Sequence, residues 1–143
     1  MNTNYEKDFV PYEQALELKK LGWGEPCFGA FISKDLTLFT FPNDHRGYVY
    51  KKNRIIGAPT FSQAFRWFRE KHLIFSSILP FQDIEDNVGL CYYYCVIELY
   101  ECSGEDILCN ETSLGASDSN FPSPEEAELE CLKKLIEIVK KQL

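Results

Sequence analysis

The stretch TFSQAFRWFREKHLIFSSILPF, residues 60–81, changes its hydrophobic period halfway along. Up to residue 72 the apolar side chains recur at helical spacing, and Thr60 with Gln63 matches a capping box at the start. The expected buried side of this helix is Phe61, Ala64, Phe65, Phe68 and His72. From residue 73 to residue 81 successive side chains alternate between two faces, as they do in a strand. A helix followed at once by a strand predicts an α+β fold.

The rest of the chain adds helices and strands on both sides of this stretch. A first helix is predicted over residues 11–21, ending before Gly22, and a last helix is predicted to begin at a Ser123 cap. The other predicted strands are 28–33, 36–41, 47–51, 54–57 and 90–101. We therefore expect a single domain over residues 1–143 of class α+β, with a mostly antiparallel sheet of four to six strands and three helices on one face.

A segment without periodicity lies between the long strand and the last helix. Residues 102–121 are rich in Ser, Asn, Asp and Gly, and from residue 101 to residue 121 there are five acids and no Lys or Arg. These features predict an acidic loop over residues 102–121. A loop of that length in a compact domain is either functional or mobile.

The long strand at residues 90–101 has two faces of different kinds. One face is apolar and carries Cys91, Tyr93, Cys95, Ile97 and Leu99. The other is amphipathic and carries Tyr92, Tyr94, Val96, Glu98 and Tyr100. If helices cover one face of the sheet, either row can lie on the uncovered face. A tyrosine row offers stacking area with a polar tip, so it is a candidate binding surface, and the alternative is that it packs under the acidic loop.

Composition and charge exclude several functional classes. The 143 residues include 15 Lys and Arg against 22 Asp and Glu, which gives a net charge of -7 and a pI near 4.9. This balance excludes a nucleic-acid-coating role, because neutralising phosphates takes clustered basic residues. No apolar run approaches the roughly 18 residues of a membrane span. Residues 1–10 lack the pattern of a secretory signal, so we expect a cytoplasmic protein without a membrane partner.

The cysteines are expected to be free thiols. They are Cys27, Cys91, Cys95, Cys102, Cys109 and Cys131. No Cys-x-x-Cys occurs, and both histidines lie far in sequence from any cysteine pair, so the sequence predicts no metal site and no cofactor. Cys91 and Cys95 point to the same face of a strand about 13 Å apart, which is too far for a disulfide.

The sequence contains few candidate catalytic residues and no known catalytic motif. The sequence contains no glycine-rich phosphate loop, no Gly-x-Ser-x-Gly and no His-Glu-x-x-His. His72 is expected on the buried side of its helix, and His45 is expected in a turn. We therefore predict a protein that is not an enzyme and assign no catalytic residue. A small hydrolase using His45 or His72 is the third hypothesis.

Side chains suited to binding are more plentiful. Aromatic rings stack on bases, and Arg makes bidentate contacts to phosphate. The candidate ligand-binding residues are Trp23, Tyr48, Trp67, Tyr92 and Tyr94 for stacking, and Arg46, Arg66 and Arg69 for phosphate. For the arginines, surface ion pairs with the many acids are the alternative.

Three blocks of the chain carry a resemblance. They are FVPYEQALELKKLG at residues 9–22, running on to EPCFG at 25–29, then APTFSQAFRWFREK at 58–71 and EEAELECLKKLIEIV at 125–139. Together they resemble a family of small uncharacterised proteins encoded by bacteriophages and mobile elements of Bacteroidetes-type bacteria. The match covers about a third of the chain, and residues 74–121 carry no motif of that family.

The resemblance implies a setting and no specific activity. It implies a small accessory phage protein acting in the cytoplasm of a bacterial host, where such proteins bind host factors or sequester nucleotide signals of antiviral defence. The leading hypothesis is therefore a non-enzymatic counter-defence protein that captures a nucleotide-like small molecule or masks a host protein. The alternative is a homodimeric interaction module that uses an aromatic sheet face.

Overall fold

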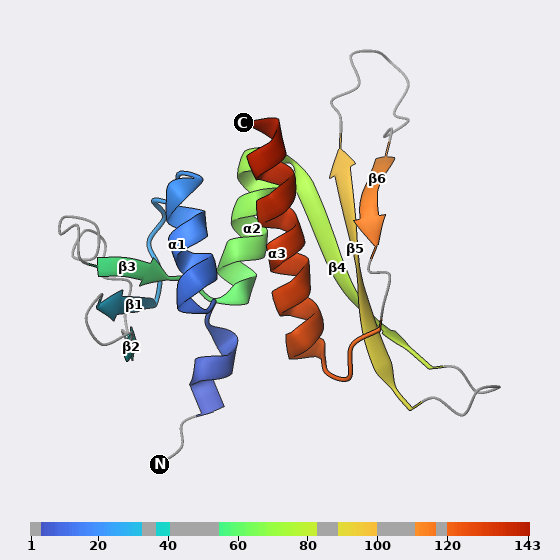
Figure 1. Cartoon of the computed structure of the whole chain (residues 1–143), viewed down its shortest axis with the longest axis horizontal. Coiled ribbons are helices and arrows are strands. Elements are labelled where there is room, and N and C mark those ends of the chain that lie inside the picture. Colours follow the sequence, from blue (N-terminus) through green and yellow to red (C-terminus); the bar gives the residue numbers. More distant parts are fainter. Residues whose placement is uncertain (1–3, 33–36, 41–54, 83–88, 100–110, 117–119) are drawn as a thin grey trace. The chain divides into compact units, whose positions relative to one another are not determined.

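The computed structural model describes residues 4–32, 37–40, 55–82, 89–99, 111–116 and 120–143 (Figure 1). Its helices and strands confirm the predicted α+β class. The chain divides into two compact units, of which the first holds Met1–Ala64 with Ile136–Leu143 and the second holds Phe65–Leu135. The helices α2 (Phe61–His72) and α3 (Pro124–Gln142) contribute residues to both units. A single domain over residues 1–143 stays a prediction.

The first unit contains a short 3-10 helix, an α-helix and a three-stranded sheet. These elements are η1 (Asn4–Asp8), α1 (Tyr12–Lys20), β1 (Gly29–Ile32), β2 (Thr37–Thr40) and β3 (Ile55–Ala58). The strand order is β2-β1-β3, and both pairings are antiparallel. The strands β1 and β2 confirm the strands predicted at residues 28–33 and 36–41, and they pair with each other. The strand predicted at residues 47–51 lies outside the described residues.

Close packing fixes the position of β1. The helix α1 packs on β3, and the ring of Tyr12 meets that of Phe31 edge-on, with centroids 5.5 Å apart. At Gly29 a Cβ atom would lie 2.7 Å from the ring of Phe9, so only glycine allows this approach. Gly22, with φ of 99°, follows the end of α1 and confirms the predicted helix stop.

The helix α2 begins as the sequence predicts. The Gln63 N–H donates to Thr60 Oγ1 at 3.3 Å, and the Thr60 N–H donates to Gln63 Oε1 at 3.0 Å, which completes the capping box. Its buried side chains are Phe61, Ala64, Trp67 and Phe68, whereas Phe65 is half-buried. The helix ends at His72, and the next residue, Leu73, has a φ of 55°, which is unusual for a non-glycine residue.

The second unit contains a second antiparallel sheet. Its strands are β4 (Ile74–Phe81), β5 (Cys91–Leu99) and β6 (Glu111–Ala116), in the order β4-β5-β6. The strand β6 corrects the predicted loop at residues 102–121, because residues 111–116 pair with β5. Pairing uses backbone N–H and C=O groups, so this segment joins the sheet without a hydrophobic alternation. The remaining loop residues 102–110 and 117–119 lie outside the described part.

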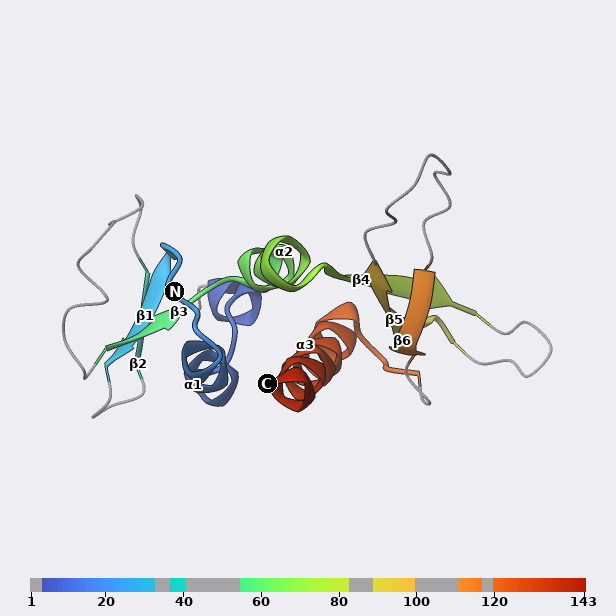
Figure 2. The ribbon, with the colours of Figure 1, turned by 90° about the horizontal axis from the view of Figure 1, so that it is seen from above.

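The six described strands therefore form two sheets where the sequence led us to expect one. The helix α1 contacts β3 of the first sheet. Figure 2 shows α3 and the end of α2 on one side of the second sheet, and the second unit takes in residues 65–72 of α2 and 124–135 of α3. The prediction of three helices on one face of a single sheet is thus replaced by a division of the helices between two sheets.

The helix α3 is capped and charged as expected. The Glu126 N–H donates to Ser123 Oγ at 3.2 Å, and acids in the first turn with lysines in the last turn complement the helix dipole. Its buried stripe consists of Ala127, Cys131, Leu132, Leu135, Ile136 and Val139.

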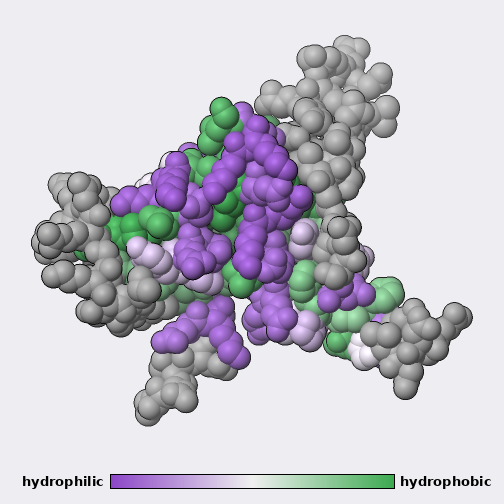
Figure 3. Space-filling model, viewed as in Figure 1, coloured by the Kyte–Doolittle hydropathy of each residue, from purple (hydrophilic) through white to green (hydrophobic). Residues whose placement is uncertain are grey.

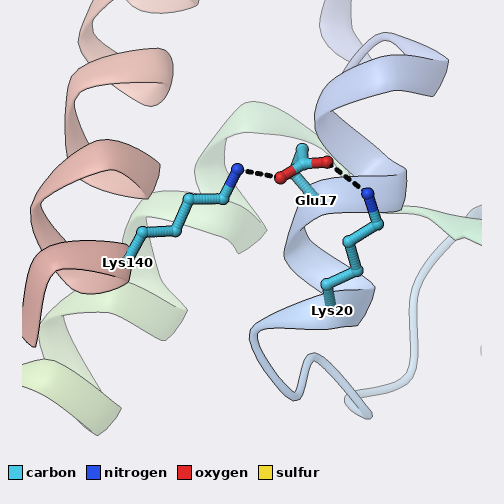
Figure 4. Close-up of polar contacts among 3 residues, drawn as sticks. All are labelled: Glu17, Lys20 and Lys140. Atoms are coloured by element: carbon cyan, nitrogen blue, oxygen red, sulfur yellow. Dashed lines mark hydrogen bonds and ion pairs between the residues drawn. The ribbon is translucent and has the colours of Figure 1, made fainter. Parts of the chain in front are cut away.

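An ion pair ties the end of α3 to α1 within the first unit. The carboxylate of Glu17 lies between the ammonium groups of Lys140 and Lys20, with a distance of 2.7 Å to Lys20 Nζ (Figure 4). Hydrogen bonds from Lys140 and then Lys20 lower the pKa of Glu17 below its ordinary value. Because all three side chains are at least a quarter exposed, the network adds little to stability.

Candidate functional site

The sheet β4-β5-β6 has one face that is covered by helical residues. Val96 and Ile74 are fully buried on this face, and Ser76, which lies opposite Val96, is hydrogen-bonded to the thiol of Cys131 in α3. Directly opposite residues of an antiparallel pair point to the same side. The even-numbered side chains of β4 and β5 therefore face α3.

The predicted tyrosine row lies on this covered face. Tyr92 and Tyr94 alternate with Val96 at spacing two, so all three side chains point the same way. Tyr94 stacks on Phe121, with ring centroids 6.2 Å apart and an interplanar angle of 13°. The structure thus brings both tyrosines together on the helix side, where Phe121 already occupies a stacking position on Tyr94.

The opposite face of the sheet is open and apolar. The odd-numbered side chains of β4 and β5 lie on this face, and among them Cys91, opposite Phe81, is buried. We define the open face as the others whose side chains are described, Phe75, Ser77, Leu79, Phe81, Tyr93, Cys95 and Ile97. Leu79 is 38% exposed and Phe81 is 41% exposed, and none of the seven side chains carries a charge at neutral pH. In Figure 3 hydrophobic surface is visible near the C-terminal end of β4 and the N-terminal end of β5, whereas the outer surface of α3 is hydrophilic. Of the two strand faces, the described residues leave the Tyr93 and Cys95 row uncovered.

Pro80 marks the outer edge of β4. The Tyr92 N–H donates to the Phe121 carbonyl at 2.8 Å, and the Tyr92 carbonyl accepts from the Phe121 N–H at 2.7 Å. Both backbone groups of Tyr92 thus point away from β4, so Pro80, which lies opposite Tyr92, directs its nitrogen to the outer edge. A proline there removes no hydrogen bond within the sheet and interrupts the addition of another strand at that point.

Trp23 lies beside a small hollow in the first unit. The hollow measures about 30 Å³ and is lined by Lys19, Trp23, Ile55 and Gly57. Small-molecule sites measure roughly 300–1,000 Å³, so this hollow holds no more than about one water molecule. Only 7% of Trp23 is exposed, which leaves little of the ring for a base to stack on.

The three candidates on α2 point in different directions. Trp67 is buried, whereas Arg66 and Arg69 are exposed. Arg66 Nε lies 2.7 Å from Glu70 Oε1, an i,i+4 ion pair of the kind expected on a solvated helix face. The structure therefore does not place the ring of Trp67 on the same surface as these two guanidinium groups. The candidates Arg46 and Tyr48 lie outside the described residues.

His72 lies in an aromatic cluster at the end of α2. Its ring centroid is 4.8 Å from that of Trp67 and 5.9 Å from that of Phe68. Its Nε2 is buried and has no hydrogen-bond partner among the described residues, and burial lowers the pKa of the ring. General base catalysis needs an oriented imidazole within reach of a nucleophile, and these surroundings are aromatic. His45 lies outside the described part of the chain.

The neutral, partly buried state of His72 predicts a loss of stability in mild acid. A histidine whose pKa is lowered by folding binds its proton more readily in the unfolded chain, so the free energy of unfolding should fall as the pH drops below about 6.5. We expect the melting temperature to decrease between pH 7 and pH 5, and His72→Gln to flatten that decrease. His45→Gln is the matched control. An unchanged slope in His72→Gln would contradict this prediction, while effects of Glu17 and Glu70 belong below pH 4.5, where their carboxylates titrate.

Among the described residues, no group of three or more His, Cys, Asp or Glu side chains is arranged to hold a metal ion. Cys27, Cys91, Cys95 and Cys131 form no disulfide, while Cys102 and Cys109 lie outside the described part. No helix in the described ranges has both the length and the apolar character to cross a membrane.

Comparison with known proteins assigns no family. No protein-family model, no curated protein and no solved structure matches the chain. The resemblance to small phage-encoded proteins therefore stays a prediction. The candidate site rests on the open face alone.

Proposed function

We propose that this chain is a non-enzymatic binding protein that engages a protein partner through the open face of the sheet β4-β5-β6. The observation that supports this proposal is an uncharged row of partly exposed side chains on a sheet whose other face is covered. Leu79 and Phe81 are its exposed large apolar members. A contiguous apolar patch on a soluble protein marks an interaction site more often than chance exposure does. Interface cores are depleted of charged residues and enriched in aromatic ones, as this face is.

A protein partner suits this surface better than a small ligand. Small molecules bind in concave pockets that bury most of their surface, whereas a twisted strand surface presents side chains outward. The nucleotide-capture version would need stacking rings beside arginines, and Trp67 is buried away from Arg66 and Arg69. Masking a protein in the cytoplasm of a bacterial host is the version we carry forward, and the free thiols are compatible with a reducing compartment.

Site-specific photo-cross-linking in bacterial cells tests this proposal. A photo-reactive phenylalanine analogue replaces Leu79 on the open face, or Arg69 on the solvated side of α2 as the matched control. We expect a covalent adduct from position 79 and a much weaker one from position 69. Phe81→Glu should remove the adduct, because a charge placed in an apolar contact must be desolvated. Equal adducts from both positions, or none from position 79, would show that the open face is not a binding surface.

A further inference from the structure

The residue after α2 breaks a local rule that the chain follows after α1. Leu73 has a φ of 55°, and among the described residues no other non-glycine residue has a positive φ. After α1 the left-handed position is occupied by Gly22, whose φ is 99°. Glycine has no Cβ, so it adopts this conformation without the steric penalty that a leucine side chain brings. The chain therefore carries at Leu73 a backbone strain that it avoids at Gly22.

Burial within the folded chain offsets only part of this strain. Leu73 is 43% exposed, whereas the next residue, Ile74, has no exposed surface. An apolar side chain stabilises a fold in proportion to the area that it removes from water. The exposed part of Leu73 thus adds nothing to the stability of the free protein. A strained residue whose large side chain stays partly in water is typical of a functional position.

Leu73 lies where the open face begins. It directly precedes β4 and stands two residues before Phe75, the first member of the open face on that strand. Like the open face, it is uncharged. We propose that Leu73 is a contact residue of the open face, whose exposed side chain enters an apolar recess on the protein partner. This inference rests on the proposed function and extends its surface to the junction between α2 and β4.

The junction holds Leu73 on a rigid base. On its α2 side Phe68 is fully buried and Trp67 is 5% exposed, and their rings meet edge-on with centroids 5.1 Å apart. On its β4 side Ile74 is fully buried. A side chain that core residues flank in this way loses less conformational entropy when a partner binds than one on a free loop. The strained turn therefore presents a preorganised apolar contact.

Leu73→Gly tests the inference because it should change stability and binding in opposite directions. Glycine removes the strain, so the melting temperature of the purified full chain should rise by about 3 °C. Glycine also removes the exposed side chain, and its burial against a partner corresponds to roughly a tenfold change in affinity. Leu73→Asn, which tolerates a positive φ but is polar, should give the same pair of changes. A purely structural role for Leu73 predicts a lower melting temperature.

The cross-linked adduct from position 79 measures binding. Each substitution is combined with the photo-reactive phenylalanine analogue at Leu79, and the adduct formed in bacterial cells is normalised to the amount of chain. Leu73→Gly should reduce this adduct at least about fivefold. Leu73→Met, which keeps the strain and an apolar side chain of similar volume, should retain it. Phe28→Gly is the matched control, because Phe28 is 44% exposed in the first unit and has no positive φ, so it should leave the adduct unchanged.

The outcomes separate this inference from the proposed function. A lower melting temperature for Leu73→Gly means that packing within the free protein offsets the strain, and it overturns the inference. A higher melting temperature with an unchanged adduct also overturns it, because the side chain then contributes nothing to binding. In both cases a specific adduct from position 79 leaves the proposed function standing. If the parent chain gives no adduct specific to position 79, the proposed function fails, and the inference fails with it.

Discussion

Phe68→Ala should lower the free energy of unfolding by about 3–5 kcal/mol, measured by urea denaturation. Phe68 has no exposed surface and is the largest of the fully buried side chains. Its ring meets that of Trp67 edge-on at 5.1 Å and lies against the ring of His72. Removing it loses the transfer free energy of the ring and leaves a cavity that the surrounding helix cannot fill. Because the free energy of unfolding of small proteins is only about 5–15 kcal/mol, this substitution removes a large part of it.

Phe81→Ala is the matched control for this prediction. The same chemical change at a ring that is 41% exposed should cost less than about 1 kcal/mol in the monomer, because no closed cavity forms. Both variants should keep the urea slope of the wild type, since that slope follows the surface exposed on unfolding. If Phe68→Ala costs no more than Phe81→Ala, the aromatic cluster at the end of α2 is not part of the core.

The helices were predictable because their signals are local. Thr60 with Gln63 and Ser123 with Glu126 are caps in which both partners lie within one turn, and the structure contains both sets of hydrogen bonds. Gly22 after α1 is equally local, because its φ of 99° is a property of one residue. Capping and helical period are set by neighbours in sequence, and they survive whatever tertiary arrangement follows.

Strand pairing was not predictable, because it joins residues that are distant in sequence. The alternation in residues 73–81 correctly predicts a strand, but it carries no information about which strand lies beside it. The segment Glu111–Ala116 lacks even alternation and becomes a strand by pairing with the edge of β5. For this reason the sequence predicted one sheet where the structure has two, and it predicted a loop where the structure has β6.

Only part of the candidate site could be predicted, because the rest depends on contacts between residues that are distant in sequence. The sequence defines two rows on β5, and it cannot say which of them α3 covers. The deciding contacts are the hydrogen bond between Ser76 and Cys131 and the stacking of Tyr94 on Phe121. Trp67 is not among the residues expected on the buried side of α2, and the structure buries it. A Trp side chain has a large apolar surface, so burying it favours a helix orientation in which Trp67 lies on the buried side.

Cys131 should react with a thiol reagent about 1,000-fold more slowly in the folded protein than in the unfolded chain. Burial raises the pKa of its thiol from 9.0 to about 12, against a smaller opposing effect of the hydrogen bond with Ser76. The thiolate is the reactive form, and three pKa units reduce its fraction at pH 8 by about a thousandfold. Because no surface of Cys131 is exposed, access lowers the rate further.

Peptide mass spectrometry after timed labelling at pH 8 measures this rate for each cysteine separately. Cys95 is the internal control, because its side chain is half-buried on the open face, so it should be modified early. In 8 M urea the two thiols should react at similar rates, since both then have the ordinary thiol pKa. Native labelling of Cys131 within about tenfold of Cys95 would contradict the prediction. It would mean that α3 separates from β4 on the timescale of labelling, and that the face we describe as covered opens as well.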